Sequence, residues 1–137
     1  MATPATTTTT VSLRNLSGDT AMLVSTTYES APAMIRSDAP LVSFQQNLST
    51  STPGSVMYDI GKLGTWMVSW TADNQVTIQI LPAGASVTWK SIWDNLQPNY
   101  ANITVTMPDG AKYNSKAEIS STGDAQILNA VILYIPN

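Results

Sequence analysis

The 137-residue chain contains no cysteine and no histidine, and these two absences remove whole classes of chemistry. Without cysteine the chain can form neither disulfides nor thiolate zinc sites. Without histidine it has no histidine-based catalytic triad, no imidazole metal ligand and no histidine proton shuttle. Charge is scarce as well, because charged residues make up 11% of the chain, less than half the usual share of about 25%.

The few charges that are present argue against a nucleic-acid partner. The net charge is −3, and the six basic residues are scattered along the sequence. Binding to a phosphate backbone requires a cluster of lysine and arginine side chains that neutralises several phosphates. The sequence therefore predicts no nucleic-acid binding.

Targeting signals and long hydrophobic runs are also missing. Residues 1–10 have neither the positive charge nor the apolar stretch of a signal peptide. The longest apolar run, residues 127–135, is interrupted by Asn129 and has about half the length of a membrane-spanning helix. The sequence predicts a protein made in soluble form without a signal peptide, cytoplasmic or released by a non-standard route.

The dominant positive feature is alternation of apolar and polar residues with a period of two, as in residues 55–60 and 102–107. Successive side chains of a strand point to opposite faces, so this pattern predicts half-buried strands. Clusters of glycine, proline, aspartate and asparagine separate these segments, as expected for turns. The predicted fold is all-β, a single-domain antiparallel β-sandwich. We place its strands near residues 9–16, 20–28, 41–48, 55–60, 65–71, 76–81, 85–93, 100–107, 111–119 and 125–135, with at most one turn of helix near residues 91–96.

The two ends of the chain contrast with each other. Residues 1–10 include five consecutive threonines and almost no apolar side chain, which predicts a disordered Thr-rich tail before a sandwich domain over residues 11–137. The last strand, residues 125–135, is apolar on both faces, so its second face requires a cover. If the protein is a homo-oligomer, we expect residues 125–135 to make the contact.

Catalytic groups are sparse in this sequence. No Ser-x-x-Lys motif accompanies the many hydroxyl groups, and a nucleophilic hydroxyl needs an activating base. A glycosidase-like pair could be drawn from Asp59, Asp73, Asp94 and Glu118, but these residues have the surroundings of solvated turns and strands. No two acidic residues lie within four positions of each other, which disfavours a calcium site. The sequence predicts a non-enzymatic protein without catalytic residues, cofactor or metal.

Aromatic residues are concentrated in one part of the chain, with six of the ten between positions 58 and 100. Trp66 and Trp70 are four residues apart, as are Trp89 and Trp93, so on strands each pair shares a face. Grouped indoles suit a sugar ring or a lipid headgroup, yet the neighbouring valines are typical of a sandwich core, which is the favoured interpretation. Both interpretations stay open. The candidate ligand-binding residues are Trp66, Trp70, Trp89, Trp93 and Tyr100, with Trp89 or Trp93 expected to be the more exposed.

Three segments carry a resemblance to a known family. Residues 11–20 (Val-Ser-Leu-Arg-Asn-Leu-Ser-Gly-Asp-Thr) combine a strand, an asparagine and a small turn. Residues 54–60 form a glycine-led strand, and the closing strand follows Gly123 and Asp124. In these features the chain resembles the aegerolysins, small acidic β-sandwich proteins of fungi and bacteria made without signal peptides. The resemblance implies a membrane-lipid-binding component of a cytolysin or toxin, often active with a larger pore-forming partner.

The sequence leaves three kinds of function open. The first is a membrane-lipid-binding β-sandwich of cytolysin type. The second is a lectin-like carbohydrate-binding module that uses the same aromatic residues together with asparagine and aspartate side chains. The third is a self-assembling structural or capsid-like β protein, favoured by the low density of charges that would otherwise keep copies apart. The expected ligand is therefore a membrane lipid or a glycan.

Overall fold

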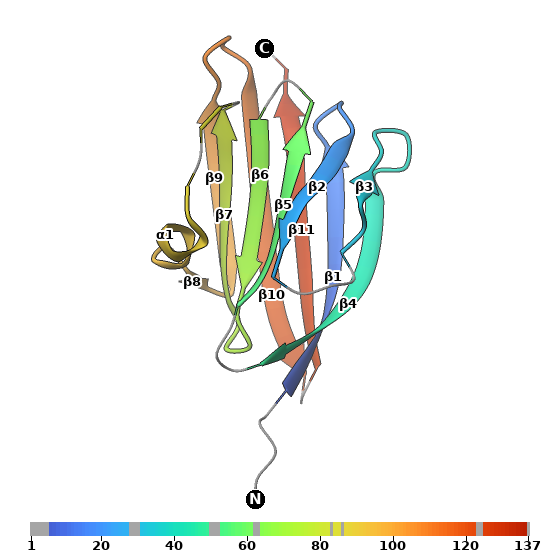
Figure 1. Cartoon of the computed structure of the whole chain (residues 1–137), viewed down its shortest axis with the longest axis vertical. Helices are drawn as coiled ribbons and strands as arrows, with labels where there is room; N and C mark the ends of the chain where they lie inside the picture. The colour runs from blue at the N-terminus through green and yellow to red at the C-terminus, as the bar shows by residue number, and fades with distance from the viewer. Residues whose placement is uncertain are drawn as a thin grey trace, which may run out of the picture.

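Two β-sheets packed face to face form the protein, with sheet B in front of sheet A in Figure 1. The computed structural model describes residues 6–27, 31–49, 53–61, 64–82, 84–85, 87–122 and 125–136. Sheet A has the strand order β4-β1-β11-β10-β9, and sheet B has the order β3-β2-β5-β6-β7-β8. The prediction of an all-β sandwich is confirmed.

The strands follow the alternating segments of the sequence closely. Sheet A consists of β1 (Thr6–Leu16), β4 (Leu41–Ser49), β9 (Tyr100–Thr106), β10 (Lys112–Thr122) and β11 (Ala125–Ile135). Sheet B consists of β2 (Ala21–Thr26), β3 (Met34–Ile35), β5 (Gly54–Ile60), β6 (Gly64–Trp70), β7 (Gln75–Pro82) and β8 (Gln97–Pro98). The two-residue strands β3 and β8 were not predicted, because two residues are too few to show alternation. Tyr28, within the predicted strand 20–28, lies outside the described residues.

One predicted strand, residues 85–93, is wrong. The structure has a short helix there, α1 (Trp89–Trp93), and the Thr88 hydroxyl caps it by accepting a hydrogen bond from the backbone N–H of Ser91. Tryptophans four residues apart share a face on a helix as well as on a strand, so the spacing itself did not distinguish the two. The cap and the following turn decide for the helix.

One strand pair departs from the predicted antiparallel arrangement. β1 and β11 are parallel, whereas the other pairs in both sheets are antiparallel. The chain leaves β1 for β2 in the other sheet, so the place beside β1 is taken by the C-terminal strand. β1 is thereby held between β4 and β11.

The core lies between the sheets and receives side chains from both. Val11 and Leu13 of β1 and Leu128 of β11 face Tyr58 and Trp66 of sheet B, and all five are fully buried. The indole N–H of Trp66 donates to Ser115 Oγ at 2.9 Å, and the Tyr58 hydroxyl donates to the carbonyl of Pro32 at 2.8 Å. Both aromatic polar atoms are therefore satisfied within an apolar interior. Burial also raises the pKa of the Tyr58 phenol above its ordinary value.

The predicted disordered tail is wrong for residues 6–10, while residues 1–5 lie outside the described part of the chain. Thr6–Thr10 belong to β1, where all five pair with β4 and Thr8, Thr9 and Thr10 also pair with β11. Thr9 is completely buried, and its hydroxyl donates to Gln126 Oε1 at 2.8 Å. Threonine is a strand-forming residue, and a buried hydroxyl costs little when it has a partner, so the segment needs no apolar side chains to be ordered.

Helices contribute little to this fold. Within the described ranges, no helix has the length and apolar character needed to cross a membrane.

The buried hydrogen bond of Thr9 leads to a stability prediction. Thr9→Val keeps the shape of the side chain but leaves Gln126 Oε1 without this donor in a buried place. We expect the free energy of unfolding to fall by about 1–3 kcal/mol in urea denaturation. The matched control is Thr10→Val on the same strand, whose side chain is on the outer face and only half-buried. A Thr9→Val variant as stable as the control would contradict the assigned role.

Candidate functional site

The four tryptophans divide between two environments. Trp66 and Trp70 point inward from β6 and are 0% exposed, so neither can touch a ligand at the surface. Gly54 lies opposite Trp70, and a Cβ at Gly54 would clash with the Trp70 indole. These two members of the predicted binding set belong to the core.

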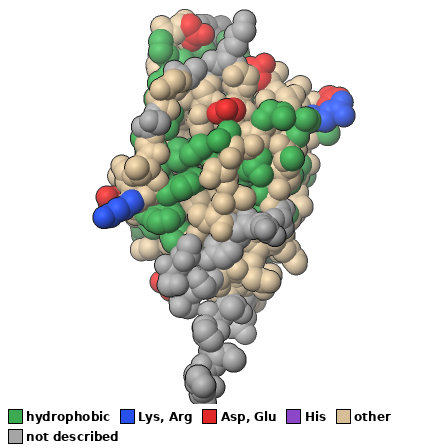
Figure 2. Space-filling model, in the orientation of Figure 1, with side chains coloured by type: hydrophobic (Ala, Val, Ile, Leu, Met, Phe, Trp, Pro, Cys, Tyr) green, Lys and Arg blue, Asp and Glu red, His purple; other side chains and the backbone are tan. Residues whose placement is uncertain are grey.

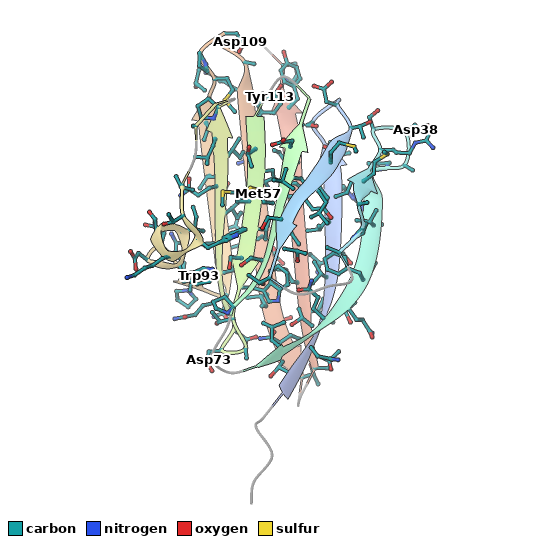
Figure 3. The ribbon with its side chains drawn as sticks, viewed as in Figure 1. Asp38, Met57, Asp73, Trp93, Asp109 and Tyr113 are labelled. Atoms are coloured by element: carbon teal, nitrogen blue, oxygen red, sulfur yellow. The ribbon has the colours of Figure 1, made fainter. Side chains whose placement is uncertain are left out.

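Trp89 and Trp93 are half-buried on α1, which lies against β7 at the side of sheet B (Figures 1 and 3). Their rings are stacked, with centroids 6.4 Å apart and an interplanar angle of 18°. The Trp93 indole N–H donates to Ser69 Oγ of β6 at 2.9 Å. Ile92, also on α1, has a buried side chain. The Trp93 indole thus attaches α1 to sheet B, and Trp89 stacks on it. This pair is more exposed than Trp66 and Trp70, as expected.

The fifth predicted residue, Tyr100, lies on the other sheet. It is 42% exposed on the outer face of β9, directly opposite Glu118 of β10. The stacked tryptophans lie on α1, which is bound to sheet B through Ser69, whereas Tyr100 belongs to β9 of sheet A. The five predicted residues do not form one site.

An open depression of about 410 Å³ lies instead on the outer face of sheet A. It is centred on β11 and β1, and β10 and the start of β4 contribute its sides. The lining side chains combine cations, one carboxylate, hydrogen-bonding groups and apolar groups: Ser12, Arg14, Leu16, Leu41, Lys116, Glu118, Asn129 and Val131.

Two cations flank this depression. Arg14 of β1 and Lys116 of β10 are both register partners of Val131, one on each side of it. Adjacent strands lie about 4.8 Å apart, so the two side chains rise roughly 10 Å from each other over the valine. Among the described residues, the one ion pair joins Arg36 and Asp38 at 2.8 Å. Within the same residues, Arg14 and Lys116 therefore have no carboxylate partner.

The same face is unusually apolar around these charges. Leu16, Leu41 and Ile127 are 44%, 54% and 51% exposed. Tyr100 adds an amphipathic ring at the side of the face. Sheet A therefore presents cations among large exposed apolar side chains.

The structure also shows which face of β11 is available to a partner. Leu128, Ala130 and Ile132 point into the core, whereas Ile127 and Val131 are on the outer face. Because β11 lies between β1 and β10, its edges are occupied. A contact through residues 125–135, as predicted from the sequence, can use only the outer face.

Sequence reasoning missed Arg14 and Lys116. Each was visible as a charged residue within an alternating strand, which is the ordinary pattern of a solvated face. They lie near each other because β1 is placed parallel to β11, and the local sequence pattern does not show that β11 is the neighbour of β1.

The two classes of tryptophan can be separated by fluorescence. In a Trp89→Phe/Trp93→Phe double variant, only the buried Trp66 and Trp70 emit. We expect its emission to move to shorter wavelength and its quenching by acrylamide to fall, because the remaining indoles do not contact water. Remaining emission that is red-shifted and easily quenched would contradict the inward placement of β6 side chains.

Comparison with known proteins adds no relative. A search of protein-family models returns no match to this chain, and a search of curated proteins returns none either. The resemblance to the aegerolysins accordingly stays a prediction from the sequence. The fold and the outer face of sheet A provide the evidence from which a function can be proposed.

Proposed function

We propose that this is a non-enzymatic binding protein that docks on anionic lipid membranes through the outer face of sheet A. The observation that carries the proposal is the pair Arg14 and Lys116, which flank an open depression and have no carboxylate partner among the described residues. An arginine guanidinium offers a fork of donors that fits phosphate oxygens, and a lysine ammonium adds a second positive charge.

The distribution of charge supports an anionic partner. Arg14, Lys112 and Lys116, three of the six basic residues of the chain, lie on this one face. Among the described residues of the sheet A strands, Glu118 is the one acidic side chain on this outer face. The chain has a net charge of −3, yet the outer face of sheet A carries an excess of positive charge. This charge distribution would orient the face toward a negatively charged surface.

The apolar side chains of the face support a membrane rather than a free phosphate. Leu16 and Leu41 line the depression beside Arg14, Ile127 lies further along β11 on the same face, and all three are about half exposed. A peripheral membrane protein gains from buried apolar area and from attraction to anionic lipids together. A soluble phosphate would use the cations and leave these side chains in water.

A lectin-like function is the second candidate, because of one row of side chains across the same face. Ser12, Asn129 and Glu118 are consecutive register neighbours, and Tyr100 follows opposite Glu118. Hydroxyl, amide and carboxylate groups beside an exposed ring are the groups that bind a sugar.

The lipid proposal is tested by co-sedimentation with phosphatidylcholine vesicles that contain or lack phosphatidylserine. We expect binding to the anionic vesicles only, decreasing as salt is raised because exposed charges are screened. Arg14→Gln/Lys116→Gln should weaken it by about 2 kcal/mol, or roughly thirtyfold, since each surface cation contributes about 1 kcal/mol. The control Arg36→Gln/Lys90→Gln removes the same formal charge from exposed positions elsewhere and should change binding far less. An equal loss in both double variants would refute the assigned face.

Glu118→Gln separates the lipid from the sugar. For a lipid surface it removes a repulsive charge from the face, so binding to anionic vesicles should tighten by about 1 kcal/mol, or roughly fivefold. For a saccharide it removes a hydrogen-bond acceptor of the row, so binding on a glycan array should weaken. Glycan binding that is lost in Glu118→Gln, without any vesicle binding, would replace the lipid proposal by the lectin.

A further inference from the structure

Four of the six methionines of the chain meet on the outer face of sheet B. Met22 of β2 is the register partner of Met34 on one side and of Asp59 on the other. Met57 lies two residues before Asp59 on the same face of β5, and Met67 of β6 is opposite Met57. The four side chains therefore occupy two adjacent rows that run across four neighbouring strands.

Strand propensity and burial do not account for the two outermost methionines. Met22 and Met34 are 46% and 43% exposed, whereas Met67 is fully buried and Met57 is half-buried. Exposed strand positions favour β-branched residues such as threonine and valine, and methionine is unbranched. Figure 2 views this face and shows hydrophobic side chains across its middle with few charged ones, and Figure 3 labels Met57 at its centre.

A thioether sulfur is a soft donor, and soft donors select soft cations such as Cu(I). Directly paired strand residues have Cβ atoms about 5 Å apart, and diagonal neighbours are about 7–8 Å apart. Met22 lies between the other two, directly paired with Met34 and diagonal to Met57. Methionine has three rotatable bonds, so the sulfurs on either side can turn toward Met22.

Two further features favour a cation at this place. Asp59, in the same row as Met22, supplies negative charge, and one of its oxygens already accepts from Thr65 Oγ1 at 3.1 Å. Among the residues that the structure describes, no three carboxylates come together as a competing metal site, and the chain has neither cysteine nor histidine. The sequence predicted no metal because cysteine and histidine are missing and the acidic residues are dispersed. Those observations do not concern thioether ligands.

From this arrangement we propose that Met22, Met34 and Met57 form a surface site for a soft monovalent cation, Cu(I) or Ag(I), with Asp59 providing negative charge beside it. The site is on the opposite side of the sandwich from the Arg14–Lys116 face and does not depend on the proposed lipid binding.

The experiment uses the full-length chain, Ag(I) in chloride-free buffer and calorimetric titration. We expect saturable binding of one ion per chain. In protein labelled with ¹³C at the methionine methyl groups, the resonances of Met22, Met34 and Met57 should shift, and that of Met107, which is buried in the core, should not. Met22→Leu/Met34→Leu keeps the apolar volume, removes two sulfurs and should weaken binding by about tenfold or more.

Met107→Leu is the matched control, because it removes one sulfur away from the site, and it should bind Ag(I) like the unmodified chain. Circular dichroism of Met22→Leu/Met34→Leu checks that the fold is kept, which is expected because both side chains are about half exposed. Three outcomes would overturn the proposal: no saturable binding, binding unchanged in the double variant, or equal shifts at Met107 and at the three proposed ligands.

Discussion

The parallel pairing of β1 with β11 is the constraint on which most of this structure depends. Nine register pairs join the two strands, from Thr8 with Ala125 to Leu16 with Leu133. On the inner side the pairing places Val11 beside Leu128 and so completes the apolar layer of sheet A. On the outer side the same pairing places Arg14 beside Val131 and within reach of the depression that Lys116 borders. A shift of one residue would exchange the two faces and destroy both arrangements.

The first and last strands, β1 and β11, are held together by polar complementarity as much as by apolar contact. Thr9 donates to Gln126, and the Gln126 amide donates in turn to the carbonyl of Thr71 and to Asn74 Oδ1. This buried polar chain links β1 and β11 to the turn between β6 and β7. A fully satisfied network of this kind fixes one arrangement, because any other would leave buried donors or acceptors unpaired.

Scarcity of charge gives each remaining charged residue unusual weight. Charged residues are 11% of the chain, so three cations on one face are enough to give sheet A its own character. The outer face of sheet B differs, since α1 covers part of it and thioethers and Asp59 occupy another part. A sandwich with two unlike outer faces can carry two independent binding sites, which is the arrangement that the lipid and soft-cation proposals describe.

Local pattern was sufficient for most of the strands. Val56, Tyr58 and Ile60 alternate with polar or less buried neighbours, and period-two alternation has one simple structural solution, a strand with one buried face. The same pattern left open whether Trp66 was core or surface. Spacing shows that Trp66 and Trp70 lie on one face of the strand, but it does not show whether that face points into the core. It also gave the wrong element for residues 85–93, where a four-residue spacing fits helix and strand alike.

The sequence by itself determined most of the strands, the absence of thiol and imidazole chemistry, and the excess of apolar residues on the last strand. The tertiary structure decided that the threonines of residues 6–10 form a strand, that Arg14 lies beside Val131 and Lys116, and that Met22 lies beside Met34. These juxtapositions join residues distant along the chain, and each becomes favourable only when strands pair in one register. The residues next to a side chain in the sequence do not show which distant strand will pair beside it. Both candidate sites could therefore be recognised only in the assembled sheets.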